Sequence, residues 1–311
     1  MKDFTTYLEL KDLANKTIAD YIEIVTYFLK YIEKEETQIT KPDILNYLEH
    51  LKNKKLENAT RQKSLIVLNH YFEHLFEENQ VIENPCINLK IRGTKKQKLC
   101  KIYTPAELQQ LFDNYNTVYV RNFDDRKTKN YRQKISELCK ERNAVMLSIL
   151  IHQGISIKEV MKIELNDLDL KKLTLKMKGC KTNRKRNIPL KPSQMGLFIY
   201  YLNDIHPQIL EYQTNETNKL FLPLPPANKR ETDTLSTKRT IYYFKKQLQV
   251  IDKQFTSFHQ LRASVITQWL KDYGLRKTQY LAGHYKVAST EKYQANNLDD
   301  LTNDINNLHP F

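Results

Sequence analysis

Apolar residues recur at helical spacing through the first third of the chain. The clearest pattern runs from Asn15 to Ile32, where an apolar residue returns every three or four positions on one face. Its members are Ile18, Tyr21, Ile22, Val25, Phe28, Leu29 and Ile32. We expect Asn15 or Thr17 to cap this helix, because both side chains can accept a hydrogen bond from its first turn. The pattern predicts a helix with one face in a core.

Further helices are predicted before residue 84. One begins near Thr40, where Thr-Lys-Pro-Asp combines a capping residue, a proline in the first turn and an acid three positions after the cap. Another runs from about Asn58 to Glu77 with apolar residues on one side. Asn84-Pro85 then breaks the pattern, because a residue before proline disfavours helical backbone. The N-terminal part of the chain is therefore expected to be a small helical domain.

A short basic stretch separates this region from the rest of the chain. Residues 92–101 read Arg-Gly-Thr-Lys-Lys-Gln-Lys-Leu-Cys-Lys without apolar periodicity, which is typical of a linker. A second capping box follows at Thr104–Glu107, with proline at the first helical position. The predicted organisation is an N-terminal domain over residues 1–92, a basic linker over 93–102 and a larger domain over 103–311.

The larger domain is predicted to combine helices with one hairpin. Residues 116–140 are mostly charged and predict a loop, followed by a helix from about Ile135 through Leu150 that becomes wholly apolar and hence buried. Apolar and polar residues alternate on both sides of the basic segment 178–185, which predicts a half-buried hairpin. Another helix is predicted over 235–251. With few glycines and prolines, these patterns favour a mainly α fold with a small antiparallel β-sheet.

Composition and charge narrow the class of protein. The chain has 50 Lys and Arg against 36 Asp and Glu, a net charge of +14, and such a surplus favours a polyanionic partner such as DNA. Its cysteines, Cys86, Cys100, Cys139 and Cys180, lie far apart, which argues against a metal site or a disulfide framework and fits a reducing cytoplasm. No window approaches the roughly 20 apolar residues of a membrane span. The sequence contains no glycine-rich phosphate-binding loop, so it gives no indication of a nucleotide cofactor.

A set of residues near the C-terminus could act together on one phosphate. His259 and Arg262 are three positions apart and share a helix face, His284 follows Gly283 in a short turn, and Tyr293 comes nine positions after His284. Attack on a phosphodiester needs a nucleophile, cationic donors around the non-bridging oxygens and a proton donor for the leaving oxygen. Any one of these residues alone is more often an ordinary packing or surface residue. Their combination predicts phosphoryl-transfer chemistry.

These residues stand in motifs that resemble those of the tyrosine recombinases, the phage integrase family. The family's H-x-L-R motif matches His259–Arg262, its L-x-G-H motif matches Leu281–His284, and its nucleophilic tyrosine stands where Tyr293 does. The resemblance implies a site-specific DNA recombinase that forms a 3′-phosphotyrosine through Tyr293. It implies that Arg262 and His284 stabilise the phosphate charge and that His259 handles the tyrosine proton. It also implies an N-terminal SAM-like core-binding domain, a C-terminal catalytic domain, and no cofactor or metal.

The basic hairpin resembles the family's β-turn that presents a lysine to the leaving 5′-oxygen. On this match Lys178 is the candidate general acid, with Lys181 as the fallback and as a candidate DNA contact, because the connection is longer here. The family's first motif, G-L-R-I-S-E-L, matches residues 154–160, but Ser156 stands at the arginine position. A hydroxyl offers one donor and no charge where a guanidinium offers a charged fork. Arg184 or Arg186 on the hairpin could supply the missing cation.

The resemblance extends more loosely to the N-terminal region and to the assembly. The predicted helix over 58–77 is similar to a helix with which the family clasps DNA, and Thr60, Arg61 and Lys63 at its start are candidate phosphate contacts. The linker lysines Lys95, Lys96 and Lys98 would lie along the same backbone. Family members work as tetramers on two duplexes, which implies a homo-tetramer on DNA in the cytoplasm of a prokaryote, nucleoid-associated when bound.

The C-terminal segment has an apolar stripe of its own. Leu298, Leu301, Ile305 and Leu308 recur at helical spacing, and a helix of about 12 residues is marginal alone in water. The stripe therefore needs a surface to pack on, either its own domain or a neighbouring subunit as in the resembling family.

Other functions stay open on the sequence alone. The first alternative is a catalytically silent DNA-binding protein that keeps the recombinase scaffold. Such a protein could have lost the first-motif arginine, as the serine at position 156 indicates. A type IB topoisomerase shares the tyrosine chemistry but relaxes supercoils as a monomer. Covalent capture on a nicked cognate site, together with a relaxation assay, would separate the three.

Overall fold

The computed structural model describes residues 2–93, 101–121, 130–180, 183–213, 216–224 and 236–294. The chain divides into two compact units, residues 1–98 and 99–311. Within the described ranges no helix is long and apolar enough to cross a membrane. Some residues singled out in the sequence fall outside these ranges, namely Lys95, Lys96, Lys98, Lys181 and the apolar stripe of the C-terminal segment.

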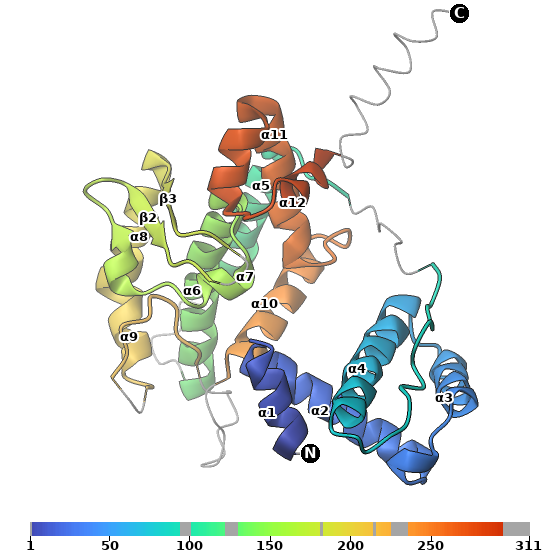
Figure 1. Cartoon of the computed structure of the whole chain (residues 1–311). Helices are drawn as coiled ribbons and strands as arrows, with labels where there is room; N and C mark the ends of the chain where they lie inside the picture. The colour runs from blue at the N-terminus through green and yellow to red at the C-terminus, as the bar shows by residue number, and fades with distance from the viewer. Residues whose placement is uncertain are drawn as a thin grey trace, which may run out of the picture. The chain divides into compact units, whose positions relative to one another are not determined.

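The regular secondary structure in the described part of the first unit is all helical (Figure 1). Its helices are α1 (Lys2–Leu10), α2 (Asn15–Ile32), α3 (Lys41–Asn53) and α4 (Asn58–Glu77), with a 3₁₀ turn, η1 (Glu36–Gln38), between α2 and α3. Helix α4 packs against α1, α2 and α3, and its Phe72 is fully buried beside Phe28 of α2. This arrangement confirms the predicted N-terminal helical domain.

The N-termini of α2 and α3 can be compared with the capping residues predicted for them. At Thr40 the prediction is confirmed: the Asp43 carboxylate accepts hydrogen bonds from the Thr40 backbone N–H (2.9 Å) and hydroxyl (2.8 Å). At α2 it is wrong, because the N-cap is Ala14 and no side chain caps the helix. The apolar contacts of Ile18, Val25 and Phe28 therefore hold α2 in place without a cap.

The second unit is built around one buried helix, α6 (Tyr131–Gln153). In Figure 1 the sheet and helices α8 and α9 lie on one side of α6, and α10 and α11 lie on the other. Every residue from 141 to 151 is buried. The other helical elements are α5 (Pro105–Tyr115), η2 (Asn116–Val120), α7 (Ile157–Val160), η3 (Leu165–Asp167), η4 (Pro192–Gln194), α8 (Met195–Tyr200), η5 (Tyr201–Ile205), α9 (His206–Leu210), α10 (Thr237–Ile251), α11 (Phe258–Ala282) and α12 (Ala288–Glu291).

The predicted loop over 116–140 is partly helical instead. Residues 116–120 form the π-helical turn η2, and α6 begins at Tyr131 rather than near Ile135. The early start follows from a capping box, in which the Asn130 side chain accepts from the Gln133 N–H (3.0 Å) and the Gln133 side chain accepts from the Asn130 N–H (3.0 Å). At α5 the predicted box is present, because Thr104 and Glu107 cap each other in the same way.

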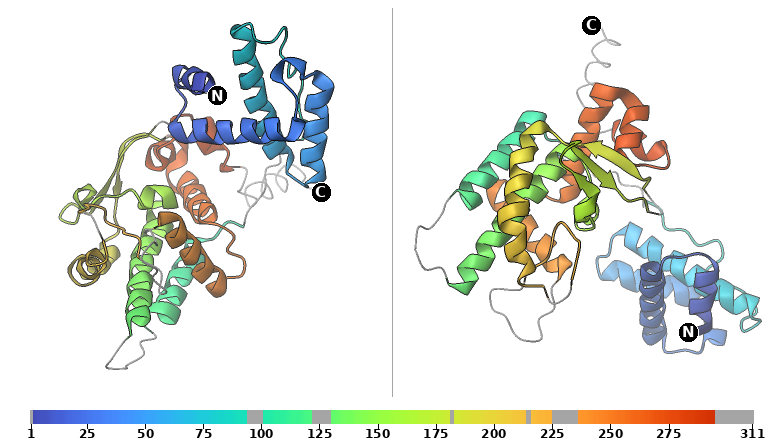
Figure 2. Two further views of the ribbon diagram at one scale, coloured as in Figure 1. Left: turned by 90° about the horizontal axis from the view of Figure 1, so that it is seen from below. Right: turned by 90° about the vertical axis from the view of Figure 1, so that its left-hand side faces the viewer.

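The predicted hairpin is confirmed as β2 (Thr174–Met177) and β3 (Arg186–Pro189), which pair antiparallel. The register places Leu175 opposite Ile188 and Met177 opposite Arg186. A short strand that the sequence did not indicate, β1 (Leu168–Asp169), pairs with β2 and completes a three-stranded sheet within the described residues. Strand β3 packs against α11 (Figure 2), which brings the end of the hairpin to the segment with the candidate residues.

Helix α11 carries the first two of these residues and turns back on itself. Gly274 has a non-helical conformation (φ 73°, ψ 178°) that divides α11 into two helical segments. The second segment ends at Gly283, whose positive φ of 75° suits glycine as a helix C-cap. The reversal returns residues 282–284 to Arg262 in the first segment.

Candidate active site

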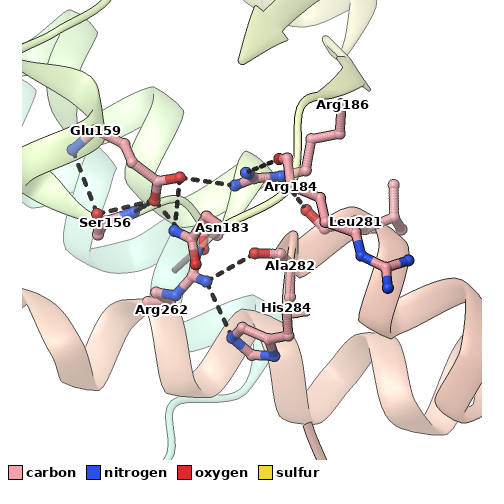
Figure 3. A network of polar contacts seen from close by, with 10 residues as sticks. Ser156, Glu159, Asn183, Arg184, Arg186, Arg262, Leu281, Ala282 and His284 are labelled. Atoms are coloured by element: carbon pink, nitrogen blue, oxygen red, sulfur yellow. Dashed lines mark hydrogen bonds and ion pairs between the residues drawn. The ribbon is translucent and has the colours of Figure 1, made fainter. Parts of the chain in front are cut away.

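Arg262 lies at the centre of the candidate site and is buried. Its Nη1 donates to the carbonyl of Gly154 (2.7 Å) and its Nη2 to the carbonyl of Ala282 (2.9 Å). The same Nη2 lies 3.2 Å from Nε2 of His284 (Figure 3). Arg262 therefore links the end of α6, both segments of α11 and the turn that follows.

His284 is a buried neutral imidazole in this arrangement. Its Nδ1 lies 2.9 Å from the hydroxyl of Thr290, on the opposite side of the ring from Arg262. Burial, and then the positive charges of Arg262 and Arg186, lower the pKa of His284 to about 4. The ring is therefore uncharged at neutral pH until negative charge arrives beside it.

Tyr293 lies against both histidines. Its ring is nearly parallel to that of His284, with 8° between the planes and 5.9 Å between the centroids. Its centroid lies 6.1 Å from that of His259, whose pKa is lowered by partial desolvation against its neighbours and by the positive charge of Arg262. His259 is exposed at the surface and Tyr293 is half-buried. The structure thus brings His259, Arg262, His284 and Tyr293 to one place on the surface of the second unit.

A buried ion-pair cluster adjoins Arg262. The Glu159 carboxylate pairs with Arg186 (Nη2–Oε1 3.1 Å) and lies 3.7 Å from Nη1 of Arg262 (Figure 3). Asn183 donates a further hydrogen bond to Glu159 (3.1 Å). Burial alone would raise the pKa of Glu159, but the two arginines and the hydrogen bonds from Ser156 outweigh it and hold that pKa below its ordinary value. Glu159 is therefore ionised, and its carboxylate links the side chains of Arg186 and Arg262.

Ser156, at the position of the family's first arginine, caps α7. Its hydroxyl and N–H both donate to Glu159 Oε2 (2.8 and 3.0 Å), and its hydroxyl accepts from the Glu159 N–H (3.3 Å). The cation beside Glu159 is instead Arg186, whose side chain is wholly buried and whose Nε also donates to the Leu281 carbonyl (2.8 Å). Arg184 is exposed, with its guanidinium 5.4 Å from the Tyr285 ring. Of the two arginine candidates, only Arg186 joins the cluster.

Lys178 is paired with acids in this structure. Its ammonium is paired with Glu164 (2.5 Å) and lies 3.9 Å from Asp167, and its side chain is 56% exposed. The hydrogen bond to Glu164 raises the pKa of Lys178, so the lysine is protonated. Lys178 and Glu159 line one cavity of about 290 Å³. The lysine is therefore at the edge of the buried cluster, with its ammonium directed to Glu164, which caps η3, and to Asp167 on η3.

In the first unit the predicted phosphate contacts lie at the start of α4. Thr60 is exposed there. Arg61 donates to the Leu48 carbonyl and to the Asn58 side chain (3.2 Å each), and Lys63 pairs with Asp20 (3.2 Å) with both side chains partly exposed. A hollow of about 490 Å³ adjoins Arg61, with a basic lining from Lys52, Lys90 and Arg92. Arg61 and Lys63 thus have partners in the chain, which a phosphate would have to displace.

Sequence reasoning missed some residues that complete the site. Thr290, which holds Nδ1 of His284, was not singled out, although it stands three positions before Tyr293, within one helical turn. Asn183 and the carbonyl of Gly154 were missed because their roles depend on how distant elements pack. In the described part of the chain no group of His, Cys, Asp and Glu side chains is arranged to hold a metal ion.

Models of known families match both units of the chain. The model for the phage integrase family matches residues 125–299, and the model for the phage integrase N-terminal SAM-like domain matches residues 1–81. The fold and the clustered tyrosine, histidines and arginine define a DNA strand-exchange enzyme of the tyrosine type. The chain belongs to the phage integrase family.

Curated relatives cover almost the whole chain. The chain is 25% identical over 320 residues to tyrosine recombinase XerC of Anoxybacillus flavithermus, covering 99% of this chain and 96% of that protein. It is 23% identical over 308 residues to the TnP I resolvase of Bacillus thuringiensis, covering 97% of each.

Solved structures share the fold. The chain resembles XerH recombinase in a post-cleavage complex with a palindromic difH substrate (TM-score 0.69, 16% identity, covering 95% of this chain and 81% of that one). It also resembles λ integrase bound to DNA (TM-score 0.65, 13% identity, covering 94% of each chain). These likenesses agree with a helical N-terminal domain followed by an integrase catalytic domain.

Proposed function

We propose that this chain is a site-specific DNA recombinase that cleaves and rejoins DNA through a 3′-phosphotyrosine. The observation that carries the proposal is the cluster in which Tyr293 lies against His284 and His259, with Arg262 3.2 Å from His284. This cluster offers a nucleophile, a proton acceptor and charged donors within reach of a single phosphate. Membership of the phage integrase family supports the same reaction.

In the proposed mechanism the Tyr293 hydroxyl attacks the scissile phosphate. A bond forms between the phenolic oxygen and phosphorus, the bond to the 5′-oxygen breaks, and the phenolic proton passes to His259. Arg262 and His284 stabilise the charge on the non-bridging oxygens. Lys178 leaves Glu164 and gives its proton to the departing 5′-oxygen. The covalent intermediate conserves the phosphodiester, so a second 5′-hydroxyl reseals the strand without a cofactor.

The missing first-motif arginine is proposed to be replaced from the hairpin. Arg186 has a wholly buried side chain paired with Glu159, so it would act through its charge and by holding Glu159 and residues 281–283 in place. Arg184 is exposed beside Tyr285, so it would be the one to touch DNA directly. The single exchange Ser156→Arg would restore the family residue, and it would remove the hydroxyl that caps α7.

The partner is double-stranded DNA, and a homo-tetramer on two sites is the proposed assembly. A λ integrase structure of similar fold (TM-score 0.61) is a tetramer bound to a Holliday junction. The candidate contacts are Thr60, Arg61 and Lys63, with Lys95, Lys96, Lys98 and Lys181 outside the described residues. We infer that the segment after Asn297 joins subunits. Deleting it should leave single-site binding intact and abolish synapsis, and unchanged recombination would contradict that role.

Covalent trapping tests the function. The substrate is a nicked duplex built on inverted repeats from the DNA that flanks the gene, so that the strand released on cleavage diffuses away. Wild-type protein should form an SDS-resistant adduct on this substrate, and Tyr293→Phe should form none while binding with unchanged affinity. An adduct with Tyr293→Phe would refute the nucleophile. Binding without any wild-type adduct would favour a silent scaffold, and relaxation of unrelated supercoiled DNA by monomer would favour a topoisomerase.

A further inference from the structure

Thr290 holds the side of His284 that faces away from Arg262. The Thr290 hydroxyl lies 2.9 Å from Nδ1 of His284, whereas Nε2 lies 3.2 Å from Nη2 of Arg262. A guanidinium can only donate, so Nε2 must be the acceptor of that pair. The proton of the neutral imidazole is therefore on Nδ1, and Nδ1–H donates to the Thr290 oxygen. The two partners together fix the tautomer of the ring.

Thr290 is also linked to the nucleophile through the main chain. Its carbonyl accepts the Tyr293 N–H (3.0 Å), and its own N–H donates to the Val287 carbonyl (2.7 Å). Thr290 is fully buried in α12, which packs on α11. Thr290 thus contacts the His284 imidazole through its side chain and the Tyr293 N–H through its carbonyl. The rings of His284 and Tyr293 are nearly parallel.

We propose that Thr290 is a positioning residue of the cleavage reaction, whose hydroxyl fixes the ring plane and tautomer of His284 so that Nε2 faces Arg262 and the incoming phosphate. This inference rests on the function proposed above. When negative charge builds on the phosphate, it raises the pKa of His284, and Nε2 takes a proton from hydronium or a buffer acid in the solvent, so that the ring becomes an imidazolium. Nδ1–H donates to Thr290 before and after that step, so Thr290 keeps the ring in place while Nε2 changes from accepting from Arg262 to donating to a phosphate oxygen.

Two threonines of α11 show that a buried hydroxyl in this unit does not need such a partner. The hydroxyls of Thr267 and Thr278 are buried without a hydrogen-bond partner in the described structure, and Thr278 is as fully buried as Thr290. Thr278→Val therefore matches Thr290→Val in shape, burial and loss of a hydroxyl. It differs in that no imidazole loses a partner.

Proton NMR of histidine-labelled protein reads the tautomer without DNA. Wild-type protein should show a slowly exchanging imidazole N–H at Nδ1, assigned to His284 by its absence in His284→Gln. Thr290→Val should lose that resonance, and Thr290→Ser and Thr278→Val should keep it. A wild-type proton on Nε2, or an unchanged resonance in Thr290→Val, would overturn the proposal. A purely structural Thr290 would not move this signal in a folded protein.

Single-turnover cleavage of the nicked duplex supplies the second measurement. At saturating protein, Thr290→Val should cleave about tenfold more slowly than wild type, as expected for one lost hydrogen bond to a buried donor. Thr290→Ser and Thr278→Val should stay within about threefold, and all variants should bind the duplex alike. Equal rates for Thr290→Val and wild type would refute the positioning role. If wild-type protein makes no adduct, the proposed function fails, and the NMR result still decides whether Thr290 fixes the ring.

Discussion

Arg186 and Glu159 form an ion pair in the interior of the second unit, with Nη2 and Oε1 3.1 Å apart and no part of the arginine side chain exposed. The pair joins β3 to α7, and the Nε of Arg186 extends the connection to the carbonyl at the end of α11. Buried pairs of this kind contribute little compared with apolar packing, but the loss of one partner leaves a buried charge without compensation.

Arg186→Ala is therefore expected to lower the free energy of unfolding by about 3–5 kcal/mol, whereas Arg184→Ala at the exposed position should change it by less than about 0.5 kcal/mol. Urea denaturation measures both. If the hairpin replaces the missing arginine, one of these variants should also cleave about 10² or more times slower while still folded, and Ser156→Arg should partly rescue it. Wild-type cleavage by both variants would contradict replacement by the hairpin.

Gly283→Ala should disturb the site beyond its effect on the backbone. Gly283 has φ 75°, and an added Cβ would lie 2.4 Å from Nη1 of Arg186. Gly274 is the matched control, because its φ is 73° and an added Cβ would meet no atom within 4 Å. Both variants should lose about 1–3 kcal/mol in urea denaturation from backbone strain. Only Gly283→Ala should also slow single-turnover cleavage at a temperature where both are folded; equal slowing would argue against the contact with Arg186.

Glu164→Gln should make cleavage faster. In the DNA-free protein Lys178 is held by Glu164, and it has to leave this acid to reach a leaving oxygen. Exposed ion pairs are weak, so the expected gain is at most about fivefold in single-turnover rate, and it should shrink at high salt. Glu216→Gln, on an exposed acid, serves as a charge-matched control. Slower cleavage by Glu164→Gln would show instead that Glu164 assists the lysine.

Ionisation of the Glu141 carboxyl should lower the free energy of unfolding as the pH rises. Burial, and then the charge of Glu137, raise the pKa of Glu141 to about 7 from an ordinary 4.5. The folded state thus binds this proton more tightly than the unfolded state, so the contribution is present below about pH 4.5 and is lost as the pH rises through 7. Glu141→Gln should therefore be more stable than wild type by about 1–3 kcal/mol at pH 8, with little difference at pH 4.5.

Urea denaturation at the two pH values checks this, with Glu137→Gln as a partial control that removes only the neighbouring charge. The buried His284 and the half-buried His152 affect stability in the opposite direction. Their pKa values of about 4 lie below the ordinary 6.5, so their contribution is lost as the pH falls from 6.5 toward 4. An equal stability difference at both pH values would contradict the account for Glu141.

Contiguous patterns were predictable from the sequence. The helix over 58–77 has the predicted bounds because its apolar face is regular. The candidate residues of 258–293 meet because α11 reverses at Gly274 and returns the residues that follow it to Arg262. The start of α6 was missed because residues 131–134 are mostly polar and carry no apolar period, although Asn130 and Gln133 form a capping pair. Pairings between distant elements could not be predicted. Arg186 reaches Glu159, and Lys178 reaches Glu164, only because the sheet packs beside α7 and η3.

The buried cluster has a simple charge count. Two guanidiniums, Arg186 and Arg262, and one carboxylate, Glu159, leave a single positive charge, because His284 is neutral. A phosphodiester bound beside Arg262 would neutralise that charge. The additional negative charge of the transition state would then have no fixed counterpart, and it would raise the pKa of the nearby His284 imidazole. The net charge of the cluster would thus balance that of the phosphodiester in the ground state. The extra negative charge of the transition state would favour protonation of His284, and the imidazolium would stabilise that charge.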